Sequence, residues 1–168
     1  MAATYEAIAT VTVGSGGAGT VTFSSIPQTY TDLLIKVSAR GDANFPNQSY
    51  EIRLNGSTSN ASGRRIYGNG ASAASDTTAY IEGVGATATA STFSNDEIYI
   101  PNYTSSNNKS VSIDNVSENN ATTAYAVLEA FLWSNSAAVT SIDLVALNAG
   151  SQEFVQYSTF TLYGIKNS

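Results

Sequence analysis

Apolar and polar residues alternate with a period of two along much of this 168-residue chain. Residues 33–40 read Leu-Leu-Ile-Lys-Val-Ser-Ala-Arg, so every second side chain from Leu33 onward is apolar. Residues 50–54, 97–100 and 110–114 alternate in the same way. Such alternation is typical of a β-strand with one face in the core and the other in water. These segments therefore predict antiparallel strands, each with one solvated side.

Residues 125–133 are apolar on both faces except at Glu129. A helix is the competing prediction, because Ala, Leu and Glu favour helices. The aromatic and β-branched residues of the segment, together with the strands predicted around it, favour a strand. A strand with two apolar faces is expected at the centre of a sheet or against a partner subunit.

Four further strands are predicted at 4–13, 20–26, 142–147 and 159–165. The first two flank the glycine-rich segment 14–19. Because glycine readily adopts the positive φ angles of a tight reversal, this segment predicts a hairpin between them.

Turn signals and one long stretch without a clear pattern complete the chain. Asn55-Gly56 directly follows a predicted strand and favours a type I′ turn. Residues 56–92 are rich in Gly, Ala, Ser and Thr, which predicts a long irregular insertion that is either functional or partly disordered. The chain is therefore predicted to form one all-β domain over 1–168, an antiparallel β-sandwich or jelly roll of about eight to ten strands.

The composition narrows the possible functions. With no His and no Cys, the chain has no Cys/His zinc site, no haem histidine, no disulfide and no histidine-activated nucleophile. The net charge is −6, and the basic residues are scattered except for Arg64-Arg65, so nucleic-acid binding is not expected. No run is long and apolar enough to span a membrane, and the N-terminus lacks a signal-peptide pattern, so synthesis in a cytoplasm is expected.

Carboxylates are the remaining candidates for acid–base chemistry. Asp96 and Glu97 are neighbours in a predicted strand, so their side chains point to opposite faces and form a poor pair. Glu129 lies in an apolar segment and is expected either to have a perturbed pKa or to be neutralised by a cation such as Arg40 or Arg53. An exposed face for Glu129 is the third alternative.

Calcium is the metal whose ligands this composition can supply, namely carboxylate and amide oxygens. Residues 42–44 and 95–97 contain such ligands, but neither segment resembles an EF-hand loop. The sequence therefore predicts no metal and no cofactor.

Aromatic side chains are candidates for a contact surface, because they anchor many protein interfaces. Four of them fall in or beside predicted loops, and two more belong to the strand with two apolar faces. The candidate interface residues are Phe45, Tyr67, Tyr80, Tyr103, Phe131 and Trp133.

Several turn-and-strand motifs resemble a known group of proteins. They occupy residues 23–35 (Phe-Ser-Ser-Ile-Pro-Gln-Thr-Tyr-Thr-Asp-Leu-Leu-Ile), 52–56 (Ile-Arg-Leu-Asn-Gly), 65–70 (Arg-Ile-Tyr-Gly-Asn-Gly), 100–103 (Ile-Pro-Asn-Tyr) and 158–165 (Ser-Thr-Phe-Thr-Leu-Tyr-Gly-Ile). In this order they are similar to the motifs of a group of tailed-bacteriophage virion proteins. The likeness spans nearly the whole chain, and each motif is structural rather than catalytic.

The resemblance implies a β-sandwich or jelly-roll component of a phage particle, without enzymatic activity. The first expectation is a capsid decoration (cement) protein that binds the major capsid protein, forms a homotrimer and resides in the virion. The alternative is a tail-fibre or receptor-binding module that recognises cell-surface glycans. A glycan hydrolase that uses two carboxylates is the third possibility.

Overall fold

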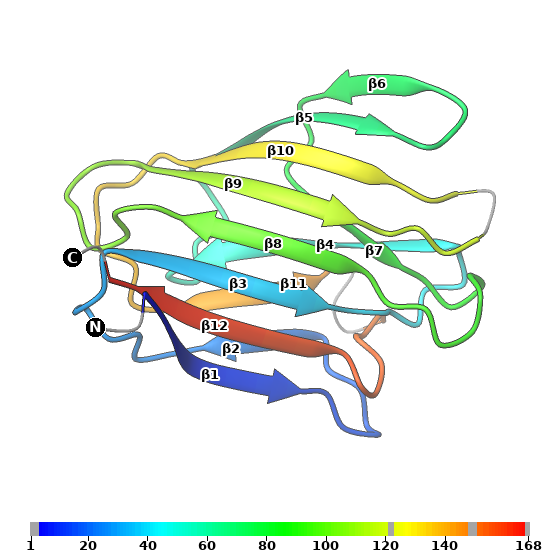
Figure 1. The fold of residues 1–168 in the computed structure, drawn as a ribbon, viewed down its shortest axis with the longest axis horizontal. Helices are drawn as coiled ribbons and strands as arrows, with labels where there is room; N and C mark the ends of the chain where they lie inside the picture. Colours follow the sequence, from blue (N-terminus) through cyan, green and yellow to red (C-terminus); the bar gives the residue numbers. More distant parts are fainter. Residues whose placement is uncertain (1–3, 121–122, 148–150, 167–168) are drawn as a thin grey trace.

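The computed structural model describes residues 4–120, 123–147 and 151–166 as two antiparallel β-sheets packed face to face. Figure 1 shows the eight-stranded sheet in front of the four-stranded sheet, with the hairpin of β5 (Ala61–Gly68) and β6 (Ala73–Asp76) extending beyond the smaller one. The described residues form strands, turns and loops but no helix. The all-β sandwich predicted from the alternating pattern is confirmed.

The larger sheet has the strand order β1-β12-β3-β8-β9-β10-β5-β6, with every neighbouring pair antiparallel. Its strands are β1 (Tyr5–Thr12), β3 (Asp32–Ser38), β5 (Ala61–Gly68), β6 (Ala73–Asp76), β8 (Asn95–Ile100), β9 (Lys109–Val116), β10 (Ala126–Trp133) and β12 (Thr159–Ile165).

The smaller sheet has the order β2-β11-β4-β7 and is also antiparallel throughout. Its strands are β2 (Thr20–Phe23), β4 (Asn47–Leu54), β7 (Ile81–Val84) and β11 (Ile142–Ala146). The described part of the chain thus has twelve strands, more than the predicted eight to ten.

The core lies between the two sheets and is built from the inward-facing half of each alternating strand. Strand β4 shows the pattern most clearly, because every second side chain from Gln48 to Leu54 is buried. Large aromatic side chains fill the interior, and the ring of Phe154 packs edge-on against both Tyr50 and Phe160. Such packing of two inner faces is the main stabilising feature of a sandwich.

Two predictions from local sequence are wrong. Residues 4–13 and 20–26 do not form a hairpin, because β1 pairs with β12 in the larger sheet and β2 pairs with β11 in the smaller one. The segment 14–19 therefore crosses between the sheets. Residues 56–92 are not an irregular insertion either, since β5, β6 and β7 all lie within them.

The predicted turn at Asn55-Gly56 is present. Both residues have positive φ angles, 53° and 67°, and the Ser57 amide donates to the Leu54 carbonyl oxygen at 3.1 Å, as in a type I′ turn. The chain does not fold back beside β4 after this turn, because β5 belongs to the other sheet.

Residues 4–120, 123–147 and 151–166 contain no helix that is long and apolar enough to cross a membrane.

Candidate functional site

The outer side of the larger sheet carries an unusual number of exposed apolar side chains. Strand β10 alternates strictly, so its even-numbered residues face outward while its odd-numbered residues face the core. Leu128 is 56% exposed. Ile66, which stands opposite Leu128 on the neighbouring strand β5, is 60% exposed. We call this surface the outer apolar face, and it consists of Ile66, Val116, Ala126, Leu128, Ala130 and Leu132.

Three open hollows meet at Leu128. The largest, of about 670 Å³, extends over β5 and β6 and is lined by Ile66 and Ala126 among others. A second, of about 500 Å³, lies on the side of Arg64 and Ala130. The third, of about 410 Å³, reaches across β9 to Tyr99 on β8. Leu128 therefore stands between shallow depressions that protruding side chains of another protein can fill.

The arrangement follows from competition between the two sides of β10. One side carries Val127, Glu129, Phe131 and Trp133, and the other carries only Ala and Leu. Burying Phe131 and Trp133 removes more apolar area from water than burying the opposite side, so that side faces the core. The leucines are left on the surface, where they suit contact with another protein.

Three of the predicted interface residues are core residues instead. Phe131 is 3% exposed, Trp133 is 2% exposed and Tyr103 is fully buried. The Tyr103 hydroxyl also donates a hydrogen bond to the Pro27 carbonyl oxygen, which fixes the loop after β8 to the loop after β2. None of these three side chains can contribute to a contact between subunits, and that prediction is wrong for them.

The other three do not gather into one surface. Phe45 is 63% exposed just before β4, and Tyr80 is 41% exposed just before β7. Because β4 and β7 are antiparallel, Phe45 and Tyr80 lie at opposite ends of β7. Tyr67 is half-buried on the inner side of β5, where its ring packs edge-on against Tyr125 at 5.8 Å between centroids.

Glu129 is buried, as the apolar segment predicted, but its surroundings differ from the expectation. It is 2% exposed, and neither carboxyl oxygen has a hydrogen-bond partner among the described residues. Burial raises its pKa from 4.5 to about 8, although the charge of Arg65 on the adjacent strand β5 acts in the opposite direction. Arg65, rather than Arg40 or Arg53, is therefore the cation that influences this group.

Asp96 is a second carboxyl group inside the sandwich and joins the two sheets. It lies on β8 of the larger sheet, and its Oδ2 atom accepts hydrogen bonds from the Tyr50 hydroxyl of β4 at 2.6 Å and the Ser94 hydroxyl at 2.7 Å. Asn115 donates to its Oδ1 atom. Burial outweighs these hydrogen bonds and raises the pKa of Asp96 to about 6. Glu97 points outward to Lys36, which confirms that the adjacent carboxylates face opposite sides.

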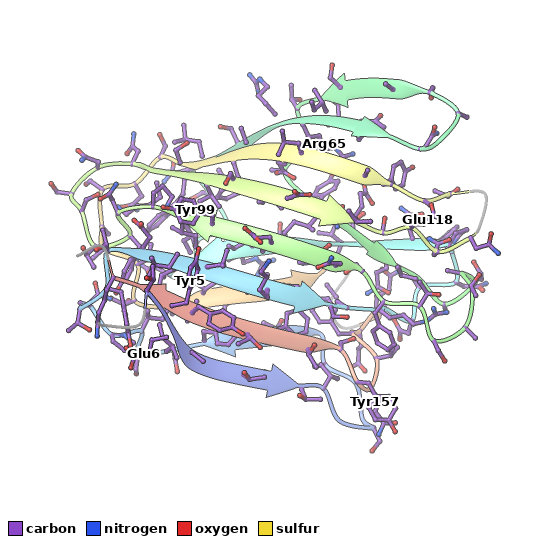
Figure 2. All side chains as sticks on the ribbon, in the orientation of Figure 1. Tyr5, Glu6, Arg65, Tyr99, Glu118 and Tyr157 are labelled. Atoms are coloured by element: carbon purple, nitrogen blue, oxygen red, sulfur yellow. The ribbon has the colours of Figure 1, made fainter. Side chains whose placement is uncertain are left out.

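Arg65 connects the hairpin β5–β6 to the smaller sheet, and Figure 2 shows its place beside β10. Its guanidinium pairs with Asp76 on β6 and with Glu82 on β7, both at 2.8 Å. This double ion pair raises the pKa of Arg65 and lowers that of Asp76 to about 2.

The interior acids do not form an accessible catalytic pair. Asp96 and Glu129 are both almost completely shielded from solvent, so a dissolved substrate cannot reach their carboxyl groups. Nor do the described residues contain a group of three or more Asp or Glu side chains that could hold a metal ion.

Comparison with protein-family models, curated protein sequences and solved structures found no significant match.

The strongest surface feature is one that residue-by-residue reasoning missed. The sequence shows that 125–133 has two apolar faces, and its aromatic side chains, rather than Leu128 and Leu132, were the predicted interface residues. The signal that could have identified them is the position of the aromatics on one side of the strand, which leaves the leucines for the other. Ile66 had no comparable signal, because the strand β5 itself was not predicted.

Proposed function

We propose that this chain is a non-enzymatic structural protein of a tailed-bacteriophage particle, acting as a capsid decoration protein that binds the major capsid protein and stabilises the shell. The single observation that carries the proposal is the outer apolar face. Exposure of the apolar Ile66 and Leu128 side chains to water is unfavourable, and contact with another protein shields both side chains from the solvent.

The strand pairing beneath the outer apolar face supports the same function. The outer apolar face lies on strands that are hydrogen-bonded on both sides, since β10 is paired with β9 and β5 over its whole length. A contact surface on a sheet is held in place without a loss of loop entropy when the partner binds. The motifs at 23–35 and 158–165 supply the link to phage particles through resemblance.

A tail-fibre module that recognises glycans is the second candidate, and Tyr157 favours it. This side chain is 68% exposed on the loop before β12, where Figure 2 labels it, and its backbone has a φ of 74°, which is uncommon for a bulky residue. A hollow of about 280 Å³ that includes the preceding residue, Gln156, is lined by Asp42 and Glu153. An exposed ring can stack on a sugar, and carboxylates can accept hydrogen bonds from its hydroxyl groups.

The copy number of the chain in purified particles tests the proposal. Quantitative mass spectrometry of the phage that encodes this chain measures it against the major capsid protein. A ratio near that of the capsid protein supports a decoration protein. A few copies per particle would instead favour the tail-fibre candidate, and absence from the particle would refute both.

A binding assay then tests the surface. Purified protein is added to particles that lack it, and the bound fraction is measured for the parent, Leu128→Asp and Phe45→Asp. We expect Leu128→Asp to bind at least about tenfold more weakly, because a carboxylate in an apolar contact must lose its water. Phe45→Asp is the matched control, with an equally exposed side chain at a distant loop. Loss of binding in Phe45→Asp alone would place the contact on the loops.

A further inference from the structure

The outer apolar face carries one cation and one carboxylate that lack an ion-pair partner within the described chain. Arg64 on β5 and Asp114 on β9 both point outward, and neither takes part in an ion pair. Among the residues that the structure describes, the Arg64 guanidinium donates only to the carbonyl oxygen of the preceding residue, Gly63, at 2.7 Å. These two charges are therefore available to a partner.

Arg64 is an exception among the cations of this chain. The chain has seven Lys and Arg residues, all of which the structure describes. Four of them pair with carboxylates, and two more donate to several backbone carbonyl oxygens. Those six residues are Lys36, Arg40, Arg53, Arg65, Lys109 and Lys166.

The two unpaired charges lie on opposite sides of the apolar strand β10. Arg64 stands opposite Ala130 across the β5–β10 pair, and Asp114 stands opposite Leu128 across the β9–β10 pair. Two strand spacings, about 10 Å, therefore separate them across the sheet. The midpoint between the two positions falls on β10, between Leu128 and Ala130.

This placement makes the surface complementary to itself. A two-fold axis exchanges the positions of Arg64 and Asp114 when it lies in the plane of the face, passes through this midpoint and is perpendicular to the line that joins them. In a pair of molecules related by such an axis, Arg64 of one copy faces Asp114 of the other, and the reverse contact forms at the same time. The apolar side chains of the two copies then cover each other, with an ion pair at either side.

We propose that in the free protein the outer apolar face is covered by a second copy of this chain, bound through a two-fold contact with two Arg64–Asp114 ion pairs. This rests on the proposed function in one respect, that the face is a protein-binding surface. Small side chains at Ala126 and Ala130 let the two sheets approach closely. The two-fold pair takes the place of the trimer expected from the resemblance, and the two copies separate when the same face binds the shell.

Charge reversal tests the pairing. Sedimentation velocity of the full chain between about 1 and 100 µM measures the association of the parent, Arg64→Asp, Asp114→Arg and the double variant. We expect a dimer for the parent and at least about tenfold weaker association for each single variant, because each places like charges together at both ends. The double variant restores the complementary pairs and regains association to within a few-fold of the parent.

The control variant is Arg53→Asp, which makes the same change on the outer side of the smaller sheet and leaves association unchanged. Fluorescence of the single, buried Trp133 verifies that each variant is folded. A monomeric parent at 100 µM, a trimer, or a double variant as weak as the single ones would overturn the inference. Loss of particle binding in Leu128→Asp with a monomeric parent would retain the proposed function and refute only the second copy as partner.

Discussion

Replacing Glu129 by Gln removes a buried acid whose charge the fold does not accommodate. Both carboxyl oxygens lack hydrogen-bond partners, and the carboxylates of Asp76 and Glu82 lie near enough to oppose a further negative charge. Arg65 is the one nearby cation that favours the charged form, and it is already paired with those two carboxylates. The folded protein therefore holds Glu129 in its neutral form at pH 7.

The size of the effect follows from the pKa. Folding raises it from 4.5 to about 8, so the folded state binds this proton more tightly than the unfolded state does. The contribution of Glu129 to the free energy of unfolding is then largest below pH 4.5, and it falls by about 5 kcal/mol as the pH rises through 8. Asp96 adds a smaller fall, about 3 kcal/mol, at lower pH, because its pKa is raised from 3.8 to about 6. Between pH 6.5 and pH 8.5 the free energy of unfolding falls by a further amount, about 2 kcal/mol, which comes from the ionisation of Glu129.

Urea denaturation at pH 6.5 and pH 8.5, followed by the fluorescence of Trp133, measures this difference. We expect the midpoint of the parent to drop by roughly 1 M urea between the two pH values, since slopes of about 2 kcal/mol per molar are usual. Glu129→Gln should show almost no drop and should exceed the parent in stability at pH 8.5. Glu118→Gln, which changes an exposed carboxyl group seen at the end of β9 in Figure 2, should behave like the parent. Equal midpoint shifts in the parent and Glu129→Gln would refute the reasoning.

Two further substitutions test how the loops and sheets are held. Arg40→Ala removes hydrogen bonds to the carbonyl oxygens of four residues within 86–92, so we expect a loss of about 2–4 kcal/mol and faster amide hydrogen exchange in that loop. Gly164→Ala places a Cβ atom 2.3 Å from the ring of Tyr30, and the displaced ring should lower stability by about 1–3 kcal/mol in thermal denaturation. Gly14→Ala, where a Cβ atom meets nothing within 4 Å, is the control for that change.

The fold class could be predicted because its strands alternate over several residues. The run from Leu33 became β3 and the segment 110–114 became part of β9, each with the predicted faces buried. The segment 125–133 became a strand rather than a helix, since its aromatic side chains all fall on one side of a strand. In these segments local sequence and tertiary structure favour the same conformation.

The strands within 56–92 could not be predicted, because they bury little. Only Gly63 is buried in β5, and β6 has no buried residue, so neither strand carries a two-residue hydrophobic period. They are held instead by pairing with β10 and by the ion pairs of Arg65, which depend on residues distant in sequence. The glycines of 14–19 likewise indicate a reversal without specifying which sheet each flanking strand joins.

The candidate site was partly predictable. The two apolar faces of 125–133 indicated that one of them is buried against a partner. Which face lies in the core and which is left on the surface depended on the opposing sheet. Burying Glu129 costs free energy and therefore favours placing the odd-numbered side of β10 on the surface. The free energy gained by burying Phe131 and Trp133 exceeds this cost while the Glu129 carboxyl group stays neutral. A sequence pattern does not give the relative size of these two free energies, and so the exposed Leu128 was not identified.

Footprinting of Leu128 with hydroxyl radicals tests the central claim most directly. The measurement compares oxidation of this side chain in the dilute protein with its oxidation in the phage particle to which the proposed function assigns the chain. If the outer apolar face is the contact surface, Leu128 is oxidised in the dilute protein and protected several-fold in the particle, together with Ile66. Equal oxidation of Leu128 in the two samples would contradict the account.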